Sequence, residues 1–362
     1  MKLGIVGLPN VGKSTLFNAI TKAGAMSENY PFCTIEPNIG IVNVPDKRID
    51  VLANMYDTLK SVYATIEFVD IAGIVKGASK GEGLGNKFLS HIRETDAIVH
   101  VVRCFEDEKI IHVDGKVDPI SDIETIDLEL IYADTETLEN KKEKVNKGVR
   151  SGDKKAIFEL SVINKLIDNL KNLIPVRNIE LTAEEKEIVT SFFLITSKPI
   201  IYVANVSEND LKDVTNNKYV NLVKEYVKPA NVITLCAKFE EDLIVLDDEE
   251  KTYMLDEYGI TESGLDKLIK EGYKILNLIS YLTAGKQEVR AWTITQNTKA
   301  PKAAGKIHTD FERGFIKAEI VSYDDLINNE TMTKAKEKGL VRLEGKDYIV
   351  KDGDIILFRF NV

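Results

Sequence analysis

The sequence predicts an α/β fold that is interrupted by an antiparallel pair of helices and followed by a smaller α+β unit. Three observations lead to this fold class. Short apolar runs alternate with helical patterns over the first hundred residues, which is typical of a sheet covered on both faces. Strand patterns then disappear between about residues 128 and 174, and they return later in the chain. Several short strand patterns surround a helical stretch in residues 278–362.

The strand patterns predict one α/β domain made from two separate parts of the chain. Apolar runs typical of strands occupy residues 2–7, 38–44, 64–73, 97–105, 198–206 and 230–238. Because the last two runs follow the helical stretch, that stretch is expected to be inserted into the domain. The domain would therefore consist of residues 1–127 and 197–277.

Residues 128–196 are expected to form the inserted helical domain. One apolar seam consists of Ile131, Leu138 and Val145, and a second of Leu160, Ile163, Ile167, Leu170 and Ile174. These spacings are helical, and a glycine-containing turn at 146–155 separates them, so an antiparallel coiled coil is predicted. A third helix is predicted after Thr182, because Glu185 follows at the spacing of a capping box.

Residues 278–362 predict a small α+β domain. The strand patterns lie at 288–296, 315–322 and 340–362, and one helix is expected over 323–339. The "KDGD" stretch at 351–354 has the composition of a turn, so the domain is predicted to end in a hairpin.

Charge and cysteine content narrow the class of protein. The formal net charge is −10, so contact with nucleic acid would need a local basic patch. The three cysteines lie far apart, which favours a reduced, metal-free protein. No leader or membrane-spanning run is recognisable. We expect a soluble cytoplasmic protein, a monomer, that binds neither DNA nor membranes.

The stretch "GLPNVGKS" at residues 7–14 matches a phosphate-binding loop between a predicted strand and a predicted helix. Backbone N–H groups of such a loop face phosphates, the lysine neutralises their charge during catalysis, and the serine hydroxyl ligates magnesium. The nucleotide-binding residues expected here are Asn10, Val11, Gly12, Lys13, Ser14 and Thr15. A tight turn that happens to carry a lysine is the alternative.

Two further positions point to hydrolysis of a nucleoside triphosphate. Asp70 and Gly73 end the strand at 64–73, at the spacing where the aspartate holds a magnesium-bound water and the glycine N–H meets the γ-phosphate. Thr34 could complete the magnesium coordination with its hydroxyl, although a plain loop threonine is the alternative.

The stretch from Asn205 to Glu208 bears on which base is bound. Guanine-binding relatives carry Asn-Lys-x-Asp at this strand end, whereas this chain reads Asn-Val-Ser-Glu, with Val206 in place of the lysine. The asparagine amide could pair with N6 and N7 of adenine. The pattern should therefore lower the preference for guanine and permit adenine. An ordinary strand end is the alternative.

Together, the phosphate loop, "YPFCTIEPNIG", "DIAGIVKGASKGEGLGNKFLSHIRETDAIVHVVRCF" and "NVSEND" resemble the Obg-like ATPases, the YchF family. The resemblance covers essentially the whole chain. It implies a Ras-like domain, an inserted coiled coil and a C-terminal domain of the TGS type with a β-grasp fold. It also implies ATP binding ahead of GTP, slow magnesium-dependent hydrolysis, and association with the ribosome.

One departure from the Ras-like pattern concerns catalysis. Ras-like enzymes place a glutamine after Asp-x-x-Gly to orient water, and Ile74 stands there in this chain. Either a partner stimulates hydrolysis or another residue orients the water. In similar proteins the histidine corresponding to His112 is a proposed catalytic group, and a solvated loop histidine is the alternative. The glycine-rich segment 76–85 is expected to be a switch loop.

The turn of the helical hairpin is a local basic region in an acidic protein. Its basic residues are Lys141, Lys142, Lys144, Lys147, Arg150, Lys154 and Lys155. Contacts with ribosomal RNA are expected from Lys141, Lys142, Lys147 and Arg150, with a solvated helix face as the alternative. The leading hypothesis is an ATP-hydrolysing switch on the ribosome. A ribosome- or RNA-binding scaffold with a structural nucleotide, and a GTPase, remain alternatives.

Overall fold

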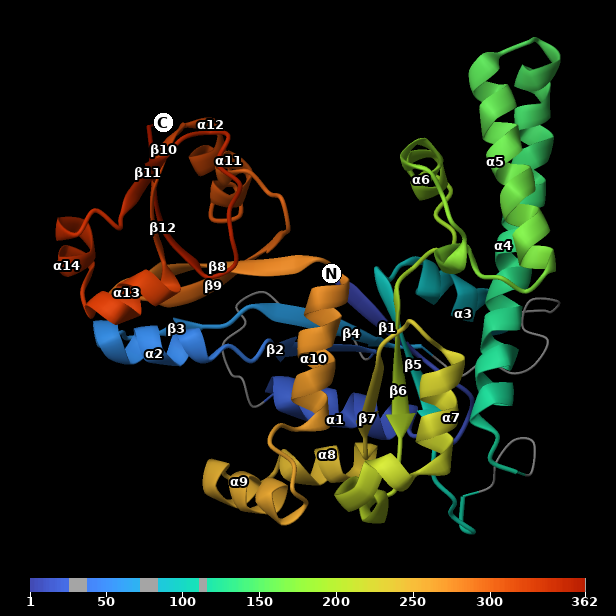
Figure 1. Cartoon of the computed structure of the whole chain (residues 1–362), viewed down its shortest axis with the longest axis horizontal. Helices are drawn as coiled ribbons and strands as arrows, with labels where there is room; N and C mark the ends of the chain where they lie inside the picture. Colours follow the sequence, from blue (N-terminus) through green and yellow to red (C-terminus); the bar gives the residue numbers. More distant parts are fainter. Residues whose placement is uncertain (26–37, 72–83, 111–115, 362) are drawn as a thin grey trace. The chain divides into compact units, whose positions relative to one another are not determined.

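The computed structural model describes residues 1–25, 38–71, 84–110 and 116–361, and these form two compact units (Figure 1). The first unit contains Met1–Ile41 and Glu67–Lys267. The second contains Val42–Ile66 and Leu268–Val362. Among the described residues no helix has the length and apolar character needed to cross a membrane.

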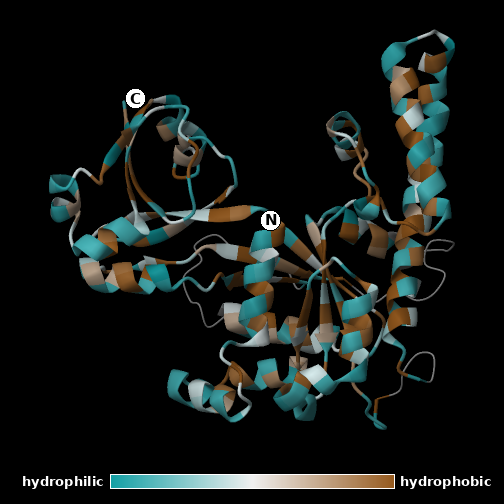
Figure 2. Cartoon of the chain, viewed as in Figure 1, coloured by the Kyte–Doolittle hydropathy of each residue, from teal (hydrophilic) through white to brown (hydrophobic). Residues whose placement is uncertain are grey.

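A six-stranded sheet forms the centre of the first unit, and it confirms the predicted α/β class. In spatial order its strands are β2 (Ile39–Asn43), β4 (Thr65–Asp70), β1 (Lys2–Val6), β5 (Ala97–Arg103), β6 (Ile200–Asn205) and β7 (Val232–Leu235). From β4 to β7 each neighbouring pair is parallel. Every residue of β5 and β6 is buried, which explains why these strands are almost continuously apolar (Figure 2).

The helices of the first unit lie between the strands of this sheet in the chain and after the last of them. They are α1 (Lys13–Ala25), α3 (Leu84–Arg93), α7 (Lys218–Tyr226), α8 (Ala237–Leu243) and α9 (Asp248–Glu257), with a 3-10 segment η3 (Glu208–Asn216). α10 (Gly264–Ile275) leads from the first unit into the second. α1 packs against α8. Because β1 and β6 are parallel and each runs into a loop and a helix, those loops open at the same edge of the sheet.

The predicted helical hairpin is present, as α4 (Pro119–Arg150) and α5 (Lys154–Lys171), two antiparallel helices joined by a short turn (Figure 1). α4 begins earlier than the periodicity indicated, because Asp118 caps it by accepting from the Ser121 N–H. After the short η2 (Val176–Asn178), α6 (Ala183–Thr190) carries the predicted capping box between Thr182 and Glu185.

A buried carboxylate fastens the hairpin to the chain that leads into β6. Asp134 of α4 accepts hydrogen bonds from the backbone N–H groups of Ile195 and Thr196, at 2.9 and 2.7 Å, and from the Thr196 hydroxyl at 2.7 Å. Burial raises the pKa of Asp134, and these hydrogen bonds oppose that rise. The three donors satisfy a group that would otherwise be costly to bury.

The second unit is an α+β domain, as predicted. Its sheet runs in the order β11 (Arg342–Glu344), β10 (Phe315–Ser322), β12 (Asp354–Phe360), β8 (Leu278–Ala284), β9 (Val289–Thr295) and β3 (Ser61–Val62). Its helices are α2 (Lys47–Tyr56), α11 (Ala300–Ala304), α12 (Thr309–Arg313), α13 (Tyr323–Asn329) and α14 (Met332–Glu337). The core lies around Tyr281, Phe315 and Phe358.

Two details of this unit differ from the sequence prediction. The hairpin predicted at 351–354 is wrong, because β11 and β12 both pair with β10, which lies between them. The helix predicted over 323–339 is divided. Glu330 ends α13 with a left-handed φ of 61°, and Thr331 caps α14 by accepting from the Lys334 N–H.

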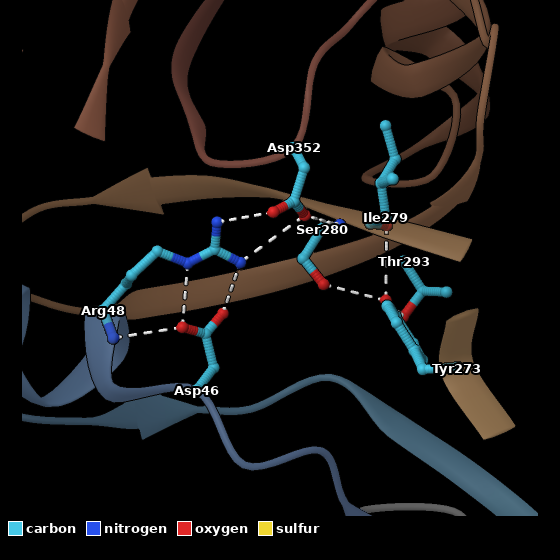
Figure 3. Close-up of polar contacts among 7 residues, drawn as sticks. All are labelled: Asp46, Arg48, Tyr273, Ile279, Ser280, Thr293 and Asp352. Carbon is cyan, nitrogen blue, oxygen red and sulfur yellow. Dashed lines mark hydrogen bonds and ion pairs between the residues drawn. The ribbon is translucent and has the colours of Figure 1, made fainter. Parts of the chain in front are cut away.

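The segment Val42–Ile66 belongs to the second unit, although its sequence pattern placed it with residues 1–127. Its helix α2 packs on β8 and β9, and β3 pairs with β9. Figure 3 shows the polar contacts: Arg48 donates to Asp46 at 2.8 Å and to Asp352 at 2.7 Å. Asp352 also accepts from the Ser280 N–H at 2.8 Å. The proposed domain limits at 128, 196 and 278 stay predictions.

Glycine is required beside this contact. Gly353 has a φ of +77°, and a Cβ there would lie 2.7 Å from Nη1 of Arg48. The Tyr273 hydroxyl lies 2.8 Å from Oγ of Ser280 and 2.9 Å from Oγ1 of Thr293, on the neighbouring strands β8 and β9 (Figure 3). Because glycine permits this close approach, the turn at 351–354 can place the Asp352 carboxylate beside the Arg48 guanidinium.

Candidate nucleotide-binding site

The phosphate loop links β1 to α1 through backbone conformations that favour glycine. Gly7 and Gly12 have φ values of +154° and +98°. A Cβ on Gly7 would lie 2.5 Å from the carbonyl oxygen of Val101, and one on Gly12 would lie 2.2 Å from Nδ2 of Asn205. Asn10 also has a positive φ, 63°. The loop therefore fits closely against two neighbouring strands, and α1 begins directly after it at Lys13.

A cavity of about 720 Å³ brings the phosphate loop together with the end of β6. The predicted residues that line it are Asn10, Gly12, Lys13, Ser14, Thr15, Asn205, Val206 and Glu208. Val11 is buried below the cavity wall, and its carbonyl oxygen accepts from Asn205. Stretches that lie far apart in the sequence thus converge on one site of a size that suits a nucleotide.

Lys13 is a buried cation at one end of this cavity. Its side chain is 8% exposed, and its Nζ donates to the carbonyl oxygen of Leu8 at 2.6 Å. Burial lowers the pKa of Lys13 to about 8, against the opposing effect of Asp70. Burial likewise raises the pKa of Asp70, and Lys13 opposes that rise. The negative charge of a bound polyphosphate would stabilise the protonated form of this buried lysine.

Asn205 has a structural role that the sequence analysis did not foresee. Its Nδ2 donates to the Val11 carbonyl oxygen at 2.8 Å, and its Oδ1 accepts from the Ala237 N–H at 2.9 Å. The side chain is buried, so both ends of the amide are used to join the phosphate loop to the start of α8. The expected pairing of this amide with adenine is therefore not supported. The physical reason is that the parallel order of β1, β5, β6 and β7 places both loops beside Asn205.

Glu208 is the first residue of η3, and it lines the cavity together with the phosphate loop. Its Oε1 accepts a hydrogen bond from the Tyr258 hydroxyl. Ser207 and Asp210 form a capping box directly beside it, which defines how the chain leaves β6. Glu208 is therefore displayed to the cavity by an ordered turn.

Sequence reasoning missed several residues of the cavity wall. They include Phe105, Asp107, Ile110, Cys236, Ala237, Lys238 and Glu241. Arg103 orders the first three, because its guanidinium donates to the carbonyl oxygens of Phe105, Asp107 and Ile110 at 3.1, 3.3 and 3.0 Å. An arginine at the end of an apolar strand was the available signal.

Several predicted positions lie outside the described residues. They are Thr34, Gly73, Ile74, His112 and all but the last two residues of the expected switch loop at 76–85. The described residues hold no group of three or more metal-ligating side chains. The exposed Ser14 hydroxyl and the Asp70 carboxylate offer the oxygen donors that suit magnesium, which usually takes few protein ligands.

The basic residues at the hairpin turn differ in exposure and in their contacts with other side chains. Nζ of Lys141 lies 3.7 Å from Oε1 of Glu159 and 4.4 Å from the centre of the Phe192 ring. Lys147 and Arg150 are exposed, and Lys142 is half-buried. Lys141 thus already has partners within the protein, and the expected RNA contacts of all four residues stay predictions.

Comparison with known proteins gives matches over the whole chain. A family model described as "50S ribosome-binding GTPase" matches residues 2–165, and the C-terminal YchF GTPase model, described as "Protein of unknown function (DUF933)", matches residues 278–361. A Bacillus subtilis protein named "Ribosome-binding ATPase YchF" is 58% identical over 361 residues, covering 99% of both chains. A Haemophilus influenzae protein of the same name is 54% identical, covering 100% of this chain and 99% of its own.

A solved structure agrees with these matches. The "Structure of the Schizosaccharomyces pombe YchF GTPase" superimposes with a TM-score of 0.91 at 42% identity, and the match covers 99% of this chain and 97% of that one. The likeness extends through the α/β unit, the helical hairpin and the C-terminal domain. Identity and coverage this high, together with a phosphate loop that faces the Asn205–Glu208 turn, show that the chain belongs to the YchF family of P-loop NTPases.

Proposed function

We propose that this protein binds ATP ahead of GTP, hydrolyses it with magnesium, and does so in association with the ribosome. One observation carries the proposal. The phosphate loop and the Asn205–Glu208 turn line the same cavity, and that turn lacks the lysine and aspartate of guanine-binding proteins. The bacterial relatives are named ribosome-binding ATPases, which supports the same reading.

The choice of base needs a chemical argument, because the yeast structure is described as a GTPase. Guanine presents two adjacent donors, N1–H and the N2 amino group, to a carboxylate. Adenine presents one amino donor beside an unprotonated N1. A turn without Asn-Lys-x-Asp lacks the acceptor arrangement that binds both guanine donors, so ATP should bind more tightly than GTP.

The residues proposed for hydrolysis come from the phosphate loop and from the sequence motifs that accompany it. Lys13 would neutralise phosphate charge, and the Gly73 N–H would contact the γ-phosphate. Ser14, Thr34 and a water held by Asp70 would hold magnesium, which when bound neutralises developing phosphate charge. His112 would orient the attacking water, because the apolar Ile74 offers no group for this. We expect slow hydrolysis until a partner binds.

The proposed partner is the ribosome, contacted in part through ribosomal RNA. The basic hairpin turn supports this in a protein of net charge −10. The proposed association with ribosomes supports a cytoplasmic location, which we also propose. We further propose that it acts as a monomer, without DNA or membrane partners.

A single-turnover experiment tests this function. Hydrolysis of ATP and of GTP is measured with and without ribosomes, giving four arms. We expect ATP to be hydrolysed faster than GTP and ribosomes to accelerate ATP hydrolysis. Faster GTP hydrolysis would refute the choice of base. ATP binding with no ribosomal stimulation would favour the second candidate, a ribosome-binding scaffold whose nucleotide is a structural ligand, which the substitution at Ile74 favours.

A further inference from the structure

Tyr258 contacts the nucleotide cavity through Glu208. It is the C-cap residue of α9, and its hydroxyl donates to Oε1 of Glu208, 50 residues away in the sequence. Both residues belong to the first unit. Tyr258 does not line the cavity itself, so any effect it has on a ligand passes through the carboxylate.

The tyrosine ring is held from two sides. It packs against the buried ring of Phe239, with 4.8 Å between ring centres, and Nζ of Lys212 lies 4.8 Å from the centre of the Tyr258 ring. Contacts of this kind restrict the ring and therefore the direction of its O–H group. The hydroxyl is a positioned donor and the carboxylate its acceptor.

The hydrogen bond fixes the protonation state of Tyr258 near neutral pH. It is the main cause that raises the pKa of Tyr258 to about 12, so the phenol keeps its proton. Within the described part of the chain, Glu208 has no other hydrogen bond or ion pair. Oε1 thus has one lone pair occupied by Tyr258, and Oε2 has no hydrogen-bond partner among the described residues.

This arrangement discriminates between the two purine bases. A carboxylate that binds guanine accepts from N1–H with one oxygen and from the N2 amino group with the other. Because Oε1 of Glu208 already accepts from the Tyr258 hydroxyl, the carboxylate has only one oxygen with both lone pairs free. That acceptor suits the one exocyclic amino group of adenine.

We propose that Tyr258 is a positioning residue that makes the site selective for adenine over guanine by holding one oxygen of Glu208. The inference rests on the proposed function, because it concerns how the same site chooses its base. It assigns a role to a residue outside the phosphate loop and outside the Asn205–Glu208 turn.

The test compares Tyr258→Phe with Tyr253→Phe, a matched control on the exposed side of the same helix. Calorimetry measures the Kd of magnesium complexes of ATP, GTP and purine riboside triphosphate, which lacks the exocyclic amino group. We expect Tyr258→Phe to lower the ratio of ATP to GTP affinity about three- to tenfold, the effect of one hydrogen bond. Its affinity for purine riboside triphosphate should not change, and Tyr253→Phe should match wild type throughout.

The remaining outcomes separate the possibilities. A merely structural Tyr258 would lower affinity for all three nucleotides equally, which would overturn the inference. Glu208→Gln should lower the same ratio, and the double variant should lose no more than Glu208→Gln, because Tyr258 acts through Glu208. An ATP preference unchanged in Tyr258→Phe overturns this inference alone. A wild type without ATP preference overturns the proposed choice of base and this inference together.

Discussion

At the scale of single residues, the buried charge of Lys13 is the main electrostatic feature of the site. Its pKa falls to about 8 because burial outweighs the attraction of Asp70. The unfolded chain would keep the ordinary value of 10.5. Between these two values the unfolded chain binds the extra proton, so this residue makes the folded state more stable as pH rises from about 8 to 10.5.

Nucleotide binding should depend on pH with the opposite sign. Phosphates stabilise the charged lysine and raise its pKa, so binding above about pH 8 should take up a proton, and affinity should fall as pH rises further. Calorimetry in buffers of different ionisation enthalpy measures the uptake. Lys13→Arg is the control, because arginine stays protonated and should abolish the uptake. Equal uptake by both proteins would show that another group titrates.

At the scale of elements, the α4–α5 hairpin carries some basic side chains that are exposed and others that already contact protein groups. Lys147 and Arg150 are exposed near the turn, whereas Lys141 is close to Glu159 and Phe192. A cation already paired with a carboxylate gains less from a phosphate than an unpaired one. The four residues grouped together by sequence are therefore not equivalent.

Replacing Lys147 and Arg150 with Gln should weaken ribosome binding and lower its dependence on log salt by about one unit per lost phosphate contact. Replacing Lys141 alone should change the slope less. Ribosome co-sedimentation across a salt series measures both. The control replaces Lys171, at the far end of α5, and Lys224, on α7, with Gln. This variant loses the same two positive charges, but away from the hairpin turn. If the Lys147 and Arg150 variant sediments like this control, the hairpin turn is a solvated helix end that does not contact the ribosome.

At the scale of the whole molecule, the chain enters the second unit twice. Val42–Ile66 leaves β2, contributes α2 and β3 to the second unit, and returns through β4. Arg48 joins this segment to Asp352, near the end of the chain. The second unit therefore depends on residues from both halves of the sequence.

Arg48→Met should destabilise the second unit by about 1–2 kcal/mol, because the Asp46 carboxylate, 12% exposed, and the Asp352 carboxylate, 49% exposed, lose their guanidinium partner. Hydrogen exchange of the α2, β8 and β9 amides measures the loss within this unit. Arg313→Met is the matched control, since Arg313 is exposed and its side chain has no hydrogen bond or ion pair to any described residue. Unchanged protection of α2 would show that apolar packing alone holds the segment.

Local patterns in the sequence were sufficient for the phosphate loop, the two long helices and the capping box at Thr182. Each depends on residues a few positions apart: glycines at a strand-to-helix turn, apolar side chains at helical spacing, and a threonine three residues before a glutamate. Backbone geometry over such short distances follows from residue type, so these elements could be read directly from the chain.

Long-range pairing was decided by the folded structure. β10 lies between β11 and β12, although a turn sequence joins the latter two, because strand order depends on which faces can be buried together. Asn205 is occupied by Val11 and Ala237, and Glu208 by Tyr258, through contacts between segments far apart in the sequence. Residue type determines which hydrogen bonds a side chain can form. Its actual partner depends on which distant segments pack together in the fold.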